Sequence, residues 1–186
     1  MSKGYAENPG CARFSYKKYY SVRALLFSKF GSPKKLVLKL HSDTRIPYVT
    51  RVLRGGDTQP ALVCSADPFL VSAYSDEMDA VVMLEFPKEL RVRYGLSVGS
   101  RLVTSNFYAP GSGSNISDDI FIGEGYLKRY RNFIPIVQLF LASDDEWIRS
   151  RIFLFDKERW DRVEALTKDH LEKHPGITRQ GFYYFM

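Results

Sequence analysis

The segment that most constrains the fold is residues 61–87, ALVCSADPFLVSAYSDEMDAVVMLEFP. It begins and ends with short apolar runs whose length and composition are typical of strands buried on both faces. Between these runs, the carboxylate of Asp67 can accept hydrogen bonds from a first helical turn, and Pro68 suits the first position of a helix. Apolar residues then recur at helical spacing up to Met78. The segment therefore predicts a strand, a short helix over residues 68–78 and a second strand.

Most of the remaining sequence up to residue 122 has strand character. In residues 35–40, leucines occupy every second position and lysines lie on the opposite face, which predicts a half-buried strand. Other candidate strands share an apolar or alternating pattern: residues 12–16, 20–27, 48–53, 101–108 and 119–122. We therefore expect a mostly antiparallel sheet built from residues 11–122, with the helix over 68–78 as its one insertion.

The last third of the chain favours helices. Apolar residues from Phe133 to Leu141 follow the spacing of one helix face. Ser143 and Glu146 form a capping box for the next helix. Asp156 can cap another helix, whose predicted inward face consists of Trp160, Val163, Leu166 and Leu171. This pattern predicts a C-terminal helical layer over residues 133–174 and, with the sheet, an α+β fold.

A chain of 186 residues with 45% hydrophobic residues is long enough to bury one core. We expect a single domain over residues 11–186, preceded by a flexible arm of residues 1–10 that contains Gly and Pro. We recognise no secretory leader, and the longest uncharged apolar run is too short to span a bilayer. Cys11 and Cys64 have neither CxxC nor metal-ligand spacing, which favours a reduced, cytoplasmic protein without membrane contact.

Charge is distributed unevenly along the chain. Residues 1–56 contain 12 Lys and Arg but only two Asp and Glu, whereas residues 57–86 contain six Asp and Glu and no Lys or Arg. Basic and aromatic residues interleave in the first block, and eight are candidate partner-binding residues: Lys17, Lys18, Tyr19, Tyr20, Lys34, Lys35, Arg51 and Arg54. Such a surface attracts phosphates and stacks on unpaired bases, which favours an acidic macromolecule or nucleic acid as partner. The alternative is that the two blocks are neighbours in the sheet and neutralise each other.

The first functional hypothesis is therefore a non-catalytic binding or assembly module. No RNP-type aromatic pattern, GxxG clamp or zinc-finger spacing accompanies the basic and aromatic residues, so no known nucleic-acid motif identifies them. The tail of residues 181–186, GFYYFM, is strongly apolar. It predicts either a homodimer contact or the completion of the core.

The second hypothesis is a small-molecule enzyme with a pocket where the strand 61–65 meets the helix 68–78, under the loop 109–117. The candidate lining residues are Ser65, Asp67 and Tyr74. This function requires a deep pocket with convergent polar groups. His170 and His174 have the spacing of a zinc pair but lack the glutamate of HExxH, so we assign no catalytic residue, no metal site and no cofactor.

Three acidic residues, Asp76, Glu77 and Asp79, follow the apolar face of the predicted helix. The helix dipole disfavours negative charge at a helix C-terminus. Either solvent or a basic neighbour compensates these carboxylates, or they form a site together with Asp67.

Overall fold

The computed structural model describes residues 8–28, 32–111 and 115–185, and it has the α+β fold that the sequence predicts. A curled sheet has the strand order β5-β3-β2-β1-β4-β6, and β7 pairs in parallel with β3. The strands are β1 (Asp57–Ala66), β2 (Phe69–Ser75), β3 (Ala80–Phe86), β4 (Arg101–Pro110), β5 (Ile120–Ile122), β6 (Tyr130–Val137) and β7 (Arg179–Gln180).

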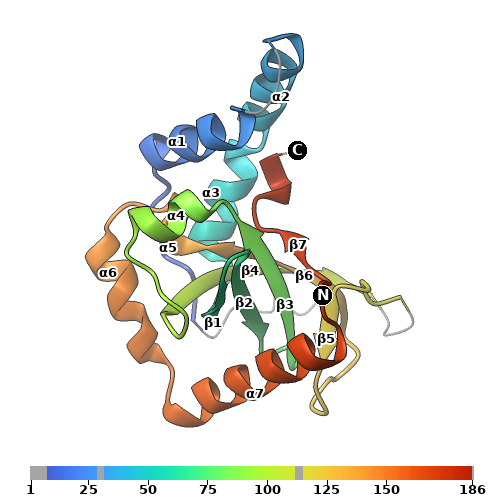
Figure 1. The fold of residues 1–186 in the computed structure, drawn as a ribbon. Coiled ribbons are helices and arrows are strands. Elements are labelled where there is room, and N and C mark those ends of the chain that lie inside the picture. Colours follow the sequence, from blue (N-terminus) through green and yellow to red (C-terminus); the bar gives the residue numbers. More distant parts are fainter. Residues whose placement is uncertain (1–7, 29–31, 112–114, 186) are drawn as a thin grey trace.

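Helices gather at the two ends of this sheet. Figure 1 shows α1, α2 and α3 at one end and α7 lying across the other. The α-helices are α1 (Tyr16–Phe27), α2 (Ser32–Thr44), α3 (Ile46–Gly55), α4 (Lys88–Arg93), α5 (Gln138–Leu141), α6 (Asp145–Ser150) and α7 (Lys157–Lys173). Two 3₁₀ turns are η1 (Arg151–Leu154) and η2 (Tyr183–Phe185). Among the described helices, none has the length and apolarity needed to span a bilayer.

The predicted helix over residues 68–78 is wrong, because this segment forms strand β2 and the turn after it. Every residue of β2 is buried, so the sequence shows no alternation between a wet and a dry face. Its apolar spacing therefore fits a helix as well as a strand. Pairing decides between them, because β2 lies between β1 and β3 and is hydrogen-bonded to both. Asp67 and Pro68 form the β1–β2 turn instead of starting a helix.

The sheet begins at Asp57 and not at residue 11, because α1, α2 and α3 replace the strands predicted before it. Leucine and lysine, which alternate in α2, are both strong helix formers. Residues that would share one face of a strand lie on different sides of a helix. Some apolar side chains of α2 therefore face the solvent, and Val37 and Leu40 are 66% and 63% exposed. Ser15 caps α1 by accepting a hydrogen bond from the Lys18 backbone N–H. Local helix signals therefore outweigh the alternation in this third of the chain.

The C-terminal helical layer is confirmed, but it starts at Gln138 and not at residue 133, because β6 continues to Val137. Helix α7 begins as predicted, with the Asp156 carboxylate accepting a hydrogen bond from the Arg159 N–H at 2.8 Å. Three of the predicted inward residues are buried, namely Trp160, Val163 and Leu166. Leu171, the fourth, is 37% exposed, because the buried face of this helix continues through Thr167 and His170 and leaves Leu171 to one side of it.

Arg179 of β7 links the two ends of the curled sheet. Its guanidinium donates to both carboxylate oxygens of Asp119, next to β5, at 2.7 Å, and to the Phe133 carbonyl in β6 at 2.8 Å. The tail after β7 then turns into the core, where Phe182 and Phe185 are buried. The tail therefore completes the core, and these two rings are not available as the apolar surface of the predicted homodimer.

The end of the predicted N-terminal arm lies against β1. Residues 1–7 fall outside the described part of the chain. The Asn8 carbonyl accepts a hydrogen bond from the Thr58 N–H at 2.7 Å, and the Gly10 N–H donates to the Gly56 carbonyl at the same distance. Residues 8–10 thus pair with the start of β1, next to the end of α3.

Candidate functional site

The eight predicted partner-binding residues have different positions in the structure. Four are exposed on α1 and α3: Lys17, Tyr20, Arg51 and Arg54. Two, Lys18 and Tyr19, are held inside the fold. The side chains of Lys34 and Lys35, in α2, lie outside the described residues. Of the six predicted residues whose side chains the structure describes, four therefore face the solvent.

Lys18 and Tyr19 anchor α1 to the rest of the molecule. The Lys18 ammonium donates to the Leu139 carbonyl at 2.6 Å and forms an ion pair with Asp145 at 2.5 Å. Burial lowers the pKa of Lys18, although the hydrogen bond to Asp145 opposes the shift. The Tyr19 ring stacks on Phe185 at 4.4 Å, and burial raises the pKa of its hydroxyl to about 12. These contacts make both side chains structural.

The exposed side of α1 carries two tyrosine rings beside a free lysine. Tyr16 and Tyr20 are one helical turn apart and are 59% and 41% exposed, with ring centroids separated by 6.2 Å. Arg23 lies over the Tyr20 ring at 4.4 Å and is paired with Asp43 at 2.5 Å. Lys17 is exposed between the two rings in sequence. We did not predict Tyr16, although its i, i+4 relation to Tyr20 is visible once α1 is known to be a helix.

The segment before α1 lies against the last turn of α3. The Cys11 N–H donates to the Arg54 carbonyl at 2.8 Å, and the Ala12 N–H donates to the Leu53 carbonyl at 3.1 Å. These bonds hold the segment before α1 against the turn that carries Arg51 and Arg54. We define the basic–aromatic surface as the exposed basic and aromatic residues of α1 and α3: Tyr16, Lys17, Tyr20, Arg51 and Arg54.

Two carboxylates of the acidic segment, Asp76 and Asp79, are neutralised by α7. Asp76 pairs with Arg159 at 3.1 Å. Asp79 accepts two hydrogen bonds from Arg162, one of them from Nε at 2.9 Å, and another from the Gly125 N–H at 2.8 Å. Burial alone would raise the pKa of Asp79, but the bonds from Arg162 and Gly125 outweigh it and hold the pKa below its usual value.

Mutual neutralisation would require the basic block, residues 1–56, and the acidic block, residues 57–86, to be neighbours in the sheet. The described part of the basic block instead forms helices α1, α2 and α3, which lie at the opposite end of the sheet from α7 (Figure 1). In the described part of the chain, no ion pair joins residues 8–56 to residues 57–86. Lys17, Arg51 and Arg54 take part in none of the ion pairs found there.

The three residues predicted to line a pocket are separated. Because β2 is a strand, the seven steps from Asp67 to Tyr74 span about 23 Å, twice the length of a helix with the same number of residues. Tyr74 lies beside Asp79 in an open hollow at the α7 end. Asp67 lines a cavity of about 450 Å³ at the other end of β2. Ser65 is half-buried near the end of β1.

A buried polar cluster, which we did not predict, lies where β1 and β4 pair. The carboxylate of Asp57 is 7% exposed and accepts hydrogen bonds from the Gln59 amide at 2.6 Å and the Tyr108 hydroxyl at 3.1 Å. Burial raises the pKa of Asp57 to about 6, because these two bonds only partly offset desolvation of the charge. The signal in the sequence is a run of polar residues at the start of β1, Asp57, Thr58 and Gln59, and in the middle of β4.

His170 and His174 face the ring of Phe121, with centroids 5.8 and 5.4 Å from it. Across residues 8–28, 32–111 and 115–185, no group of three or more His, Cys, Asp or Glu side chains is arranged to hold a metal ion.

Comparisons of the chain with protein-family models, with characterised proteins and with solved structures found no match. Functional inference therefore depends on the geometry of the chain itself.

Proposed function

We propose that this chain is a cytoplasmic, non-catalytic binding module that holds an acidic macromolecule on its basic–aromatic surface. The observation that supports this function is that Lys17, Arg51 and Arg54 are exposed and lack an acidic partner among the described residues, while α7 neutralises Asp76 and Asp79 of the acidic segment. Unpaired cations on a surface attract polyanions and release their counterions on binding.

The two exposed tyrosine rings favour a single-stranded nucleic acid as the first probe. Aromatic side chains stack on unpaired bases of any sequence, and nearby cations neutralise the phosphates between them. Tyr16 and Tyr20 provide two rings on one side of α1, next to Lys17. An acidic polypeptide supplies the charge without the bases, so comparing the two probes separates the contribution of the rings from that of the cations.

The test measures the affinity of the full chain for a fluorescent single-stranded oligonucleotide and for polyglutamate at several salt concentrations. The test variant combines Lys17→Gln, Arg51→Gln and Arg54→Gln. The control variant combines Lys157→Gln, Lys168→Gln and Lys173→Gln, three exposed lysines of α7. Each variant loses three positive charges, so an effect of net charge alone appears equally in both.

We expect the test variant to lose about tenfold or more in affinity for the oligonucleotide, and the slope of log K against log salt to fall by about two, at about 0.7 per phosphate contact. The control variant should change both quantities much less. Equal losses in the two variants would show attraction by net charge without a specific surface. Binding that does not depend on salt would contradict the proposed function directly.

A further inference from the structure

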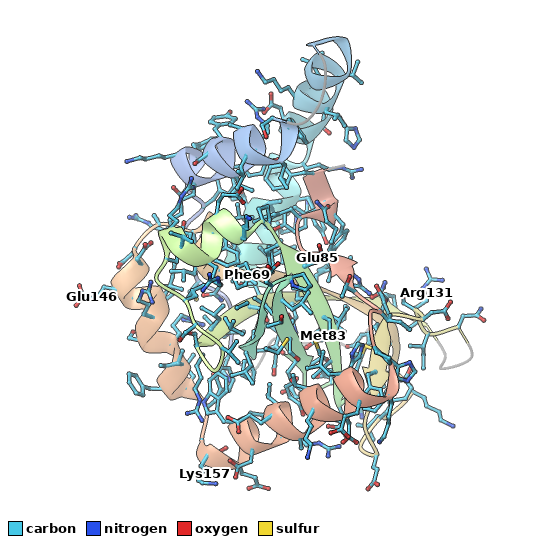
Figure 2. All side chains as sticks on the ribbon, in the orientation of Figure 1. Phe69, Met83, Glu85, Arg131, Glu146 and Lys157 are labelled. Atoms are coloured by element: carbon cyan, nitrogen blue, oxygen red, sulfur yellow. The ribbon has the colours of Figure 1, made fainter. Side chains whose placement is uncertain are left out.

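A cavity of about 450 Å³ lies at the end of the sheet below α1. Its walls come from the last turn of α1, the β1–β2 turn, the end of β3 with the start of α4, and β7. Figure 2 shows Phe69 and Glu85, which both line it, at this end of the sheet. The volume is in the range of pockets that bind small organic molecules and is too small for a folded partner.

The inner part of the cavity is apolar. Phe69 and Phe86 are buried, with their ring centroids 6.0 Å apart, and face the cavity from neighbouring strands. Leu25 and Leu26 of α1 are half-buried and close the opposite wall. An apolar group that enters this space displaces water from aromatic and aliphatic surface, which favours binding.

The outer part of the cavity is acidic. Asp67, Glu85 and Glu89 line it together with one cation, Lys88. None of the three carboxylates is in an ion pair with any described residue, and Glu85 accepts one hydrogen bond, from the Thr178 hydroxyl at 3.2 Å. The excess of negative charge favours a positively charged group at the mouth of the cavity.

Gln180 adds an amide to the polar residues that line the same cavity. Its side chain lines the same cavity, and its carbonyl oxygen is buried without a partner among the described residues. Buried polar atoms are nearly always hydrogen-bonded in folded proteins. This oxygen has almost no accessible surface, so the exposed carboxylates are the acceptors open to a ligand, and an ammonium group supplies donors to them without an acceptor of its own.

We propose that this cavity binds a small amphipathic amine, with the apolar part of the ligand against Phe69 and Phe86 and its ammonium among Asp67, Glu85 and Glu89. This site is separate from the basic–aromatic surface, which attracts charge of the opposite sign. Its occupant is therefore a different ligand from the acidic macromolecule of the proposed function.

The test follows backbone amide signals of the ¹⁵N-labelled full chain by NMR during titration with four probes. Two are amines, 2-phenylethylamine and hexylamine. The other two are a neutral and an anionic analogue, 2-phenylethanol and 3-phenylpropanoate. We expect both amines to shift the amides of Ser28, Phe69 and Gln180, with 3-phenylpropanoate binding at least about tenfold more weakly than 2-phenylethylamine.

A double variant, Asp67→Asn with Glu89→Gln, removes two exposed carboxylates without changing side-chain size. It should weaken amine binding about two- to fivefold for each charge and leave 2-phenylethanol unchanged. The matched control, Glu158→Gln with Glu172→Gln in α7, should leave amine binding unchanged.

Either of two results would overturn the proposal. One is that the neutral or anionic analogue binds as tightly as 2-phenylethylamine. The other is that neither amine shifts these amides at about 10 mM, a concentration at which even ligands of the lowest affinity are visible.

Discussion

Arg162 in α7 lies against Asp79, whereas Arg54 in α3 is exposed and has no acidic partner in the described part of the chain. The first arginine compensates a carboxylate that is mostly buried, so the fold depends on it. The second contributes an electric field to the surface and little to packing. The comparison between the α7 end and the basic–aromatic surface shows that similar side chains serve stability in one region and leave charge available for a partner in the other.

The largest expected effect comes from removing the same side chain in both regions. Arg162→Ala leaves the Asp79 carboxylate, 11% exposed, with only the Gly125 N–H and the Tyr74 hydroxyl as partners. We expect the free energy of unfolding to fall by about 3 kcal/mol, because a poorly solvated charge loses its counterion. Arg54→Ala should change it by less than about 0.5 kcal/mol. Urea denaturation measures both values, and equal losses would remove the distinction between the two regions.

Asp57 and Asp79 sharpen the comparison within the acidic segment, because only Asp79 has a guanidinium partner. The pKa of Asp57 is raised to about 6 in the folded chain, so this residue stabilises the fold below about pH 4 and the contribution is lost as the pH rises through 6. The loss amounts to about 2 to 3 kcal/mol. The pKa of Asp79 is lowered, so its contribution is present above about pH 4 and is lost as the pH falls.

Stability curves between pH 4 and 7 measure these opposite slopes. Asp57→Asn resembles the protonated acid, so the variant should match the unchanged chain near pH 4 and exceed it in stability near pH 7. Asp79→Asn should be less stable than the unchanged chain at pH 7, with the difference shrinking toward acid. An Asp57→Asn variant that is destabilised most at pH 7 would contradict the unpaired, buried state of this carboxylate.

The features that sequence analysis predicted correctly depend on local signals. Asp156 caps α7 through a contact three residues away, and the inward positions of that helix follow its own period. The choice between helix and strand at β2 instead depended on its two partner strands, which no pattern within β2 encodes. The short helix was the wrong choice because complete burial hides the strand period.

The candidate surface could be predicted only in part for the same reason. Lys17 and Lys18 are adjacent and chemically identical, yet Lys17 is exposed while Lys18 is held by Leu139 and Asp145, 121 and 127 positions away. Similarly, Asp67 and Tyr74 are seven positions apart, and the change from helix to strand places them at different cavities. Charge composition indicated the basic region, but long-range contacts decide which of its cations are free.

The smallest expected effect tests whether the rings of the basic–aromatic surface act together with its cations. Tyr16→Ala with Tyr20→Ala should weaken binding of a single-stranded oligonucleotide about thirtyfold, because each exposed ring that stacks on a base contributes about 1 kcal/mol. The salt dependence should stay unchanged, since no phosphate contact is lost. Binding of polyglutamate should also stay unchanged. Fluorescence anisotropy measures all three quantities.

Phe153 provides the matched control, since its ring is 83% exposed on η1, outside the basic–aromatic surface. Phe153→Ala should leave the affinity for the oligonucleotide unchanged, because this ring is not part of the surface that is proposed to hold the bases. If it weakened binding as much as the tyrosine pair, exposed rings would stack on bases wherever they lie. The variant with both tyrosines replaced could also bind polyglutamate more weakly. The substitutions would then have disturbed α1, and displaced cations, not the missing rings, would explain the weaker binding of the oligonucleotide.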